Sequence, residues 1–123
     1  MSKGLINAYT YLLFNNDKIE ELDLSRFGIK DINDFSVALC QHKMLKVLNL
    51  SGNNIENIDK LSEALKVNKT LINLDLSNNK ITNIDKLYEA LMINKNLKEI
   101  NLKYNNISNL KKLQEIKHIK VIY

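Results

Sequence analysis

The sequence of 123 residues contains few of the residues that support crosslinks, phosphate loops or membrane insertion. Its single cysteine, Cys40, excludes an internal disulfide and a structural zinc site, so packing alone has to stabilise the fold. The three glycines are scattered, which excludes a glycine-rich phosphate loop. No apolar run approaches the roughly 18 residues of a membrane span, and the run at 11–14 is too short for a secretory signal. We therefore expect a soluble, intracellular protein located in the cytoplasm.

The chain does contain an internal repeat. Its length, 45% apolar residues and 26% charged residues fit one globular domain, 1–123. A shift of 26 residues superimposes apolar positions along the chain, and segments 45–70 and 71–96 agree at 16 of 26 positions without a gap. We predict an N-terminal helical cap at 1–18, repeats at 19–44, 45–70, 71–96 and 97–118, and a terminal strand at 119–123.

Each repeat combines two hydrophobic periods. Residues 48–50 alternate apolar and polar side chains as a short strand does, whereas apolar residues follow helical spacing from Ile58 to Leu65. Asn57 or Asp59 can cap the first helical turn. Such a unit cannot cover its own apolar stripe, so it must stack on the next copy. The predicted fold class is α/β, a right-handed solenoid with about five parallel strands on the concave side and helices on the convex side.

The repeated motif LxxLxLxxNxI starts at Leu45, Leu71 and, with isoleucine as its second apolar residue, Leu97; it resembles the leucine-rich repeat. The Ala-Leu-x-x-Asn segments at 64–68 and 90–94 resemble ribonuclease-inhibitor-type repeats, a class shared by Ran GTPase-activating proteins and tropomodulins, here shortened to 26 residues. The Asn-Ile-Asp-Lys-Leu turn is closer to the short repeats of protein-phosphatase regulatory subunits. The resemblance implies the solenoid fold and leaves the subfamily and the function open.

The repeated asparagines Asn53, Asn79 and Asn105 are the most conspicuous polar residues. We expect their amides to bond backbone groups in the strand-to-helix turn and to stack as an inner ladder, because a buried amide must find partners. Phe27 stands at this position in the first repeat. The ladder should therefore begin one unit later, with an aromatic ring packed in its place.

The last repeat is shorter than the others. Residues 119–123 resemble 45–49, so the final turn is predicted to span 22 residues, with Val121 beside Glu99 and Tyr123 beside Asn101. A fifth strand here would have no polar cap after it and would leave backbone donors and acceptors free. Two outcomes stay open: a blunt end protected by Tyr123 and a lysine, or self-association or docking of another segment at 119–123.

The side chains between the core leucines should face away from the helices and form columns, because neighbouring parallel strands lie about 4.8 Å apart. These columns contain four acids against two bases, so the concave face is predicted to be mildly acidic although the chain has a net charge of +4. A protein partner should therefore present a basic or mixed patch. The candidate partner-binding residues are Glu21, Asp23, Asn49, Asn73, Asp75, Glu99, Asn101, Lys103 and Tyr104.

The surplus lysines occupy two repeat positions on the helix side, with Lys60, Lys86 and Lys112 at one and Lys43, Lys69 and Lys95 at the other. A single arginine and the lack of an aromatic platform for bases argue against nucleic acid, and acids beside the lysines argue against an anionic membrane. A solvated face is the favoured interpretation.

Candidate catalytic groups do not form a constellation. Cys40 and His42 point to different sides of a helix, and His42 and His118 fall at non-equivalent repeat positions. The serines in repeat register have no base beside them. We predict no enzyme, no cofactor and no metal site.

Together these features favour a protein–protein interaction module, or scaffold, that binds another protein on the concave face. One alternative is a regulator of a GTPase or a phosphatase, which rests on the family resemblance alone. The other is a structural piece that assembles with itself through its open C-terminal edge.

Overall fold

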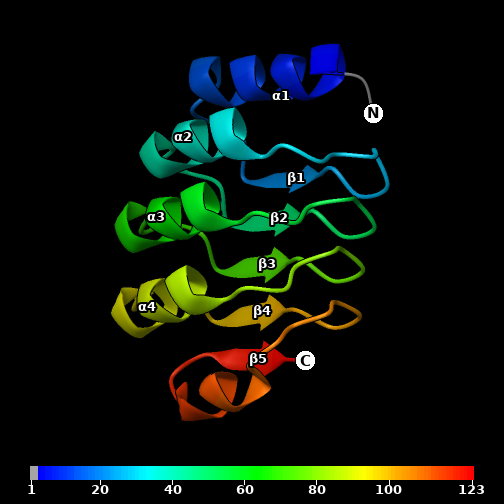
Figure 1. The fold of residues 1–123 in the computed structure, drawn as a ribbon. Coiled ribbons are helices and arrows are strands. Elements are labelled where there is room, and N and C mark those ends of the chain that lie inside the picture. The colour runs from blue at the N-terminus through cyan, green and yellow to red at the C-terminus, as the bar shows by residue number, and fades with distance from the viewer. Residues whose placement is uncertain (1–2) are drawn as a thin grey trace.

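The computed structural model describes residues 3–123, with side chains from residue 6 onward. Strands and helices alternate along the chain and form a stack of coils (Figure 1). The helices are α1 (Lys3–Asn15), α2 (Asn33–Gln41), α3 (Asp59–Val67), α4 (Asp85–Ile93) and the 3-10 helix η1 (Leu110–Glu115). The strands are β1 (Glu21–Asp23), β2 (Val47–Asn49), β3 (Asn73–Asp75), β4 (Glu99–Asn101) and β5 (Lys120–Ile122). This arrangement confirms the predicted α/β solenoid.

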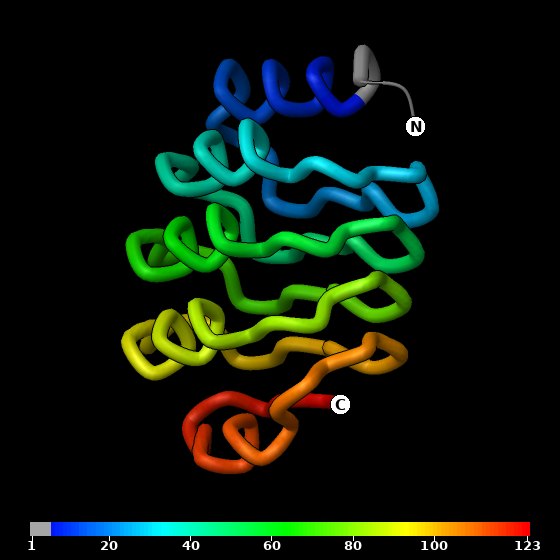
Figure 2. The backbone as a smooth tube through the Cα atoms, in the orientation of Figure 1, coloured from blue at the N-terminus to red at the C-terminus, as the bar shows by residue number. Residues whose placement is uncertain are grey.

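The five strands form one parallel sheet in the order β1-β2-β3-β4-β5. The 26-residue period sets the pairing of the first four strands, so that Leu22 lies beside Leu48, Leu48 beside Leu74, and Leu74 beside Ile100. The leucines two positions later, Leu50 and Leu76 among them, are fully buried as well. Equivalent residues are thus neighbours in space, with α1 at one end of the stack and β5 at the other (Figure 2).

The predicted register of the last strand is wrong by one residue. Lys120 pairs with Glu99, Val121 with Ile100 and Ile122 with Asn101, so the offset is 21 residues where the sequence predicted 22. The reason is the short helix before it. A 3-10 helix rises about 2.0 Å per residue against about 1.5 Å in an α-helix. The six residues of η1 therefore span nearly the length of the nine-residue helices, and Val121 turns inward while Lys120 reaches solvent.

The first coil is closed by α1, which packs along α2. Leu13 is buried, and the rings of Tyr9 and Phe27 lie 5.8 Å apart. The prediction that an aromatic ring packs where the other repeats have asparagine is confirmed. The helix caps differ in detail from expectation: Asp59 makes no cap, and the Asn57 Oδ1 atom accepts the Asp59 backbone N–H at 2.9 Å.

The asparagine ladder is confirmed. The Asn53 side chain accepts the backbone N–H groups of Phe27 and Ile29 and donates to the carbonyls of Leu24 and Leu50. Asn79 and Asn105 donate to the corresponding carbonyls one and two coils later, and each accepts one backbone N–H, from Ile55 and Ile81 respectively. Each amide bonds two coils at once, which fixes their spacing.

A second ladder lies at the turns that follow the helices. The Asn68 and Asn94 amides donate to the carbonyls of Leu39 and Leu65 and accept the backbone N–H groups of Leu71 and Leu97. The histidines extend this ladder at both ends. The His42 Nε2 atom lies 2.8 Å from the Asn16 carbonyl, and the His118 Nε2 atom lies 2.8 Å from the Leu91 carbonyl. The prediction that the two histidines are non-equivalent is therefore wrong: the short last repeat hides the match.

Candidate partner-binding face

The strand residues that alternate with the core leucines share one face of the sheet. In the first column Glu21 pairs with Val47, Val47 with Asn73, and Asn73 with Glu99. In the second column Asp23, Asn49, Asp75 and Asn101 are neighbours. All of these side chains are partly or fully exposed, while the residues between them point into the core. The structure therefore brings the predicted strand residues together on one face, with Lys103 and Tyr104 exposed at the turn that follows β4.

The second column also closes the turns after the strands, a role that was not predicted from the sequence. Each of its side chains accepts, through Oδ1, the backbone N–H two residues further on: Asp23 from Ser25, Asn49 from Ser51, Asp75 from Ser77 and Asn101 from Lys103. Aspartate and asparagine form such Asx turns readily. The sequence feature that could have predicted these turns is that this repeat position contains only aspartate and asparagine in the first four strands. One oxygen of each side chain is used inside the turn, and the rest of the group faces solvent.

Two carboxylates on this face, Asp23 and Asp75, accept hydrogen bonds from the serine two residues further on. The Ser25 hydroxyl and backbone N–H hold the pKa of Asp23 below its ordinary value of 3.8. The Asp75 Oδ1 atom accepts the Ser77 hydroxyl at 2.7 Å as well as the Ser77 N–H at 2.9 Å. Asp23 therefore stays ionised at neutral pH and presents negative charge on the sheet, while Ser77 holds the Asp75 carboxylate in place.

The corrected register changes the charge of the face. Lys120 takes the place given to Val121 and lies 3.6 Å from the Glu99 carboxylate. The face then has four acids against three bases, Arg26, Lys103 and Lys120. Glu21, Asp23 and Asp75 lie on β1 and β3, with Arg26 in the turn after β1, whereas Lys103 and Lys120 belong to the last two coils. A mixed face thus replaces the mildly acidic one.

The turn that follows each strand contains a residue in the left-handed region. Arg26, Gly52, Asn78 and Tyr104 have φ values of +59°, +69°, +56° and +60°. Glycine and asparagine adopt this conformation easily, whereas arginine and tyrosine do so at a cost of about 1 kcal/mol. The Tyr104 side chain is 67% exposed, and the Lys103 ammonium lies 5.6 Å from its ring centre. Tyr104 is therefore an exposed aromatic residue held in an unfavourable backbone conformation.

Two of the lysines on the helix side lie beside acids. Lys112 lies 3.0 Å from the Asp85 carboxylate and 5.4 Å from the Tyr88 ring centre, and Lys60 pairs with Glu63 at 3.9 Å. Tyr88 is partly buried against the core, and its hydroxyl bonds the Glu115 carboxylate, which raises the pKa of Tyr88. Neighbouring acids thus offset the charge of Lys60 and Lys112 within the lysine columns.

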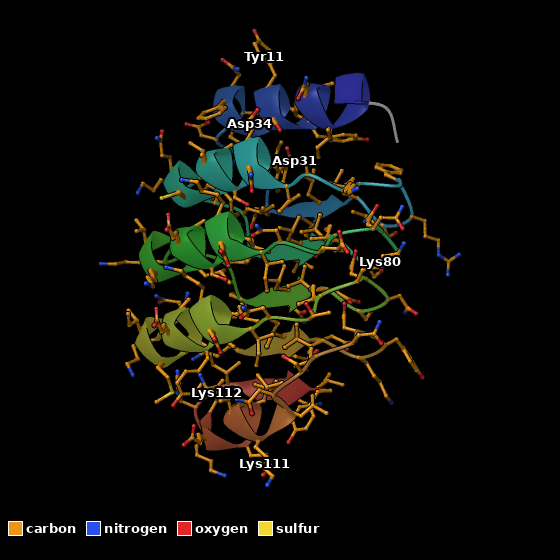
Figure 3. All side chains as sticks on the ribbon, viewed as in Figure 1. Tyr11, Asp31, Asp34, Lys80, Lys111 and Lys112 are labelled. Atoms are coloured by element: carbon orange, nitrogen blue, oxygen red, sulfur yellow. The ribbon has the colours of Figure 1, made fainter. Side chains whose placement is uncertain are left out.

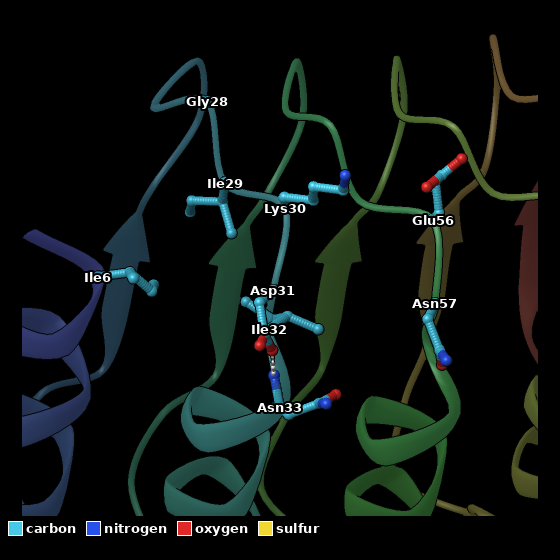
Figure 4. A pocket seen from close by; sticks show the side chains of 9 residues that line it. All are labelled: Ile6, Gly28, Ile29, Lys30, Asp31, Ile32, Asn33, Glu56 and Asn57. Atoms are coloured by element: carbon cyan, nitrogen blue, oxygen red, sulfur yellow. Dashed lines mark hydrogen bonds between the residues drawn. The ribbon is translucent and has the colours of Figure 1, made fainter. Parts of the chain in front are cut away.

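A hollow of about 450 Å³ lies on the loop side of the first two coils (Figure 4). Ile6, Ile29 and Ile32 line it together with polar residues of the loops that precede α2 and α3. This hollow was not predicted from the sequence. The sequence feature that could have predicted it is the half repeat at 1–18. Residues 3–6 of α1 are helical, whereas the equivalent residues 29–32 of the next coil form an extended loop, so the first coil lacks the matching loop that would cover residues 29–32.

Within residues 3–123, no group of three histidine, cysteine, aspartate or glutamate side chains is placed to hold a metal ion. No helix in the same range is long and apolar enough to cross a membrane. His42 and His118 bond backbone groups of the second ladder, and Cys40 lies partly exposed on α2.

Two family models match parts of the chain. The Leucine Rich repeat model matches residues 41–58 and 94–110, and a second Leucine Rich Repeat model matches residues 70–89. The chain has no match among curated proteins.

Solved structures extend the likeness to nearly the whole chain. Leiomodin-1 actin-binding site 2 (ABS2) superimposes with a TM-score of 0.85 at 21% identity, covering 99% of this chain and 80% of that chain. The tropomodulin C-terminal domain of Caenorhabditis elegans gives 0.76 at 14% identity, covering 95% and 81%. The Chaetomium Mex67:Mtr2 subunits give 0.61 at 20% identity, covering 94% and 83%. At these identities the likeness defines the fold.

The repeated motif, the asparagine ladder and the parallel sheet define the fold class: the chain contains leucine-rich repeats stacked as an α/β solenoid. Leucine-rich-repeat domains commonly act as protein-interaction modules. The assignment to the ribonuclease-inhibitor type stays a prediction.

Proposed function

We propose that this chain binds a partner protein on its concave sheet face. The observation that carries the proposal is the register of the first four strands, which aligns exposed polar side chains in two columns on a rigid surface. Because the two ladders fix the spacing of the coils, little conformational entropy is lost when a partner docks. The proposed contact residues are the strand residues Glu21, Asp23, Asn49, Asn73, Asp75, Glu99 and Asn101, with Lys103 and Tyr104 at the turn.

The partner should carry a mixed surface. Glu99 is offset by Lys120, so Asp75 is the central free acid and should contact a basic group. Tyr104 provides an aromatic anchor of the kind that dominates binding energy in many interfaces. The likeness to leiomodin-1 actin-binding site 2 and to tropomodulin makes actin the first partner to test.

The test compares capture of actin, and of proteins from a lysate, by the wild-type chain and by Asp75→Asn. Asparagine keeps the Ser77 bond, as Asn49 keeps the Ser51 bond, so the variant removes charge without removing the turn. Followed over time, capture by Asp75→Asn should be about threefold to tenfold slower than capture by the wild-type chain. Glu63→Gln on α3 is the matched control, since it removes an acid from the helix side. Equal loss in both variants, or no loss in Asp75→Asn, would place the binding surface elsewhere.

Self-association through β5 is a second candidate function. In the described part of the chain, β5 is the last strand of the sheet, and β4 is its single partner. An edge strand of this kind presents unpaired backbone groups that another chain can bind.

A further inference from the structure

Both ends of the sheet leave their core column incompletely covered. Leu22 of β1 and Val121 of β5 are only partly buried, whereas Leu48, Leu74 and Ile100 at the same repeat position are 0% exposed. Within residues 3–123 no strand pairs with the outer edge of β1 or of β5. Each end thus exposes apolar surface that an additional coil would cover.

The backbone of β5 is oriented for a further strand. Its bonds to β4 use Lys120 and Ile122, since the Lys120 N–H donates to Lys98 at 2.9 Å and the Ile122 carbonyl accepts the Leu102 N–H at 2.7 Å. Successive residues of a parallel strand point their backbone groups to opposite sides. The N–H and C=O of Val121 therefore point away from β4.

The helix layer is uncovered at the same two ends. On α1 the side chains of Tyr11, Leu12 and Phe14 are 70%, 39% and 50% exposed, and Tyr11 points away from the stack (Figure 3). The residue of α2 equivalent to Leu12 is Ala38, which is 1% exposed. At the other end Leu110 and Tyr123 are each 45% exposed, and Tyr123 lines a hollow of about 370 Å³ together with Leu113, Ile116 and Val121.

The two ends carry opposite charge. Residues 1–34 contain six acids and four bases, whereas residues 95–123 contain seven lysines and two glutamates. Glu21 and Lys120 occupy the same repeat position at opposite ends of the sheet. Two β5 ends brought together would oppose lysines, whereas a β5 end brought to a β1 end pairs lysine with glutamate.

We propose that the two ends bind each other between copies of this chain. β5 of one copy pairs in parallel with β1 of the next, in the register Lys120–Glu21, Val121–Leu22 and Ile122–Asp23, and α1 of the second copy covers η1 of the first. Because this contact joins different surfaces, it leaves one free end on each side and adds copies in a row. The proposal rests on the second candidate function, self-association, and names the surfaces that meet.

The experiment measures the mass of the wild-type chain by sedimentation velocity over a wide range of concentration. We expect the mass to rise with concentration and the rise to weaken in high salt, because the paired charges are exposed. Glu21→Lys and Lys120→Glu should each weaken association about fivefold to tenfold. An equimolar mixture of the two variants should associate again, because Lys at position 21 of one then faces Glu at position 120 of the other.

Further variants test whether association depends on backbone pairing at β5 and on charge at these two ends in particular. Val121→Pro removes the outward N–H and leaves the β4 bonds, so it should block assembly without unfolding the chain. Glu56→Lys and Lys80→Glu, on exposed mid-chain loops, are the charge controls and should change nothing. Thermal melts report whether each variant is folded.

Three results would overturn the proposal. The first is a monomer at every concentration, and the second is association that Lys120→Glu weakens but Glu21→Lys does not. The third is failure of the equimolar mixture of the two variants to associate. The second result would indicate pairing of two β5 ends, so self-association itself would survive. Concave-face binding is measured separately, by partner capture with dilute chain, so either activity can fail alone.

Discussion

The polar side chains of this protein differ in what they bond: some are buried and bond only the backbone, and others bond the backbone while they also face solvent. Asn53 and Asn79 are polar, yet both are buried, as predicted, and each bonds two coils. Asp23 and Asp75 are exposed, but one oxygen of each closes the turn after its strand. A substitution on the concave face must therefore preserve that bond if its effect on binding is to be interpreted.

Asp23 provides a pH test of this turn. Because the Ser25 hydroxyl and N–H lower its folded-state pKa, the turn contributes stability that is present above the ordinary pKa of 3.8 and is lost as pH falls through the lower folded value. We expect carbon-detected NMR to show a carboxyl midpoint below 3.8. Ser25→Ala removes the hydroxyl and should move the midpoint upward; an unchanged midpoint would mean that the hydroxyl is not the cause.

Replacing Tyr104 tests two separate effects, the backbone strain at this residue and the contribution of its ring to partner binding. Tyr104→Gly relieves the left-handed conformation and should raise the free energy of unfolding by about 0.5 to 1 kcal/mol. The same change should weaken partner capture, because it removes the exposed ring. Asn78→Gly is the control, since asparagine already tolerates a φ of +56° and little stability should be gained. Chemical denaturation measures the first effect, and loss of stability in Tyr104→Gly would contradict the strain argument.

At the scale of the elements, the turns set the geometry more than the helices do. The inner helices have the same length, nine residues, and their following turns are closed by Asn68, Asn94 or a histidine. The six-residue η1 shortens the last coil and shifts β5 by one residue. Element length thus decides which side chains of the last strand reach the concave face.

His42 tests the second ladder. Its Nδ1 atom accepts the backbone N–H groups of Met44 and Leu45 at 3.2 and 3.0 Å, and the residue is buried. His42→Ala leaves these groups unpaired and should cost about 2 to 4 kcal/mol of unfolding free energy. His42→Asn restores the residue found at 68 and 94 and should cost less than about 1 kcal/mol. Equal losses from urea denaturation would show that asparagine cannot replace histidine here.

At the scale of the whole molecule, each coil contacts its neighbours, so stability should vary along the stack. Coils in the middle are covered on both sides, whereas α1 and β5 are covered on one. In solenoids of this kind the end coils open first.

Hydrogen exchange should reveal this gradient. In dilute solution we expect amides of α3 and β3 to exchange at least about tenfold more slowly than those of α1 and η1, since each 1.4 kcal/mol of opening free energy is a factor of ten. At high concentration, assembly should slow exchange at Val121 in particular. Uniform exchange along the chain would indicate that all coils open together.

The sequence by itself determined the fold, the register of the first four strands, the asparagine ladder and the columns of the concave face. It could do so because a constant period of 26 residues makes equivalent positions neighbours in space, and buried leucines and amides leave one way to stack them. Where the period breaks, the same reasoning failed. The register of β5, the equivalence of His118 with Asn94 and the placement of Lys120 beside Glu99 were decided by the tertiary structure. A 3-10 helix advances the chain farther per residue than an α-helix does, and the sequence of residues 110–115 alone does not show which of these two helices it adopts.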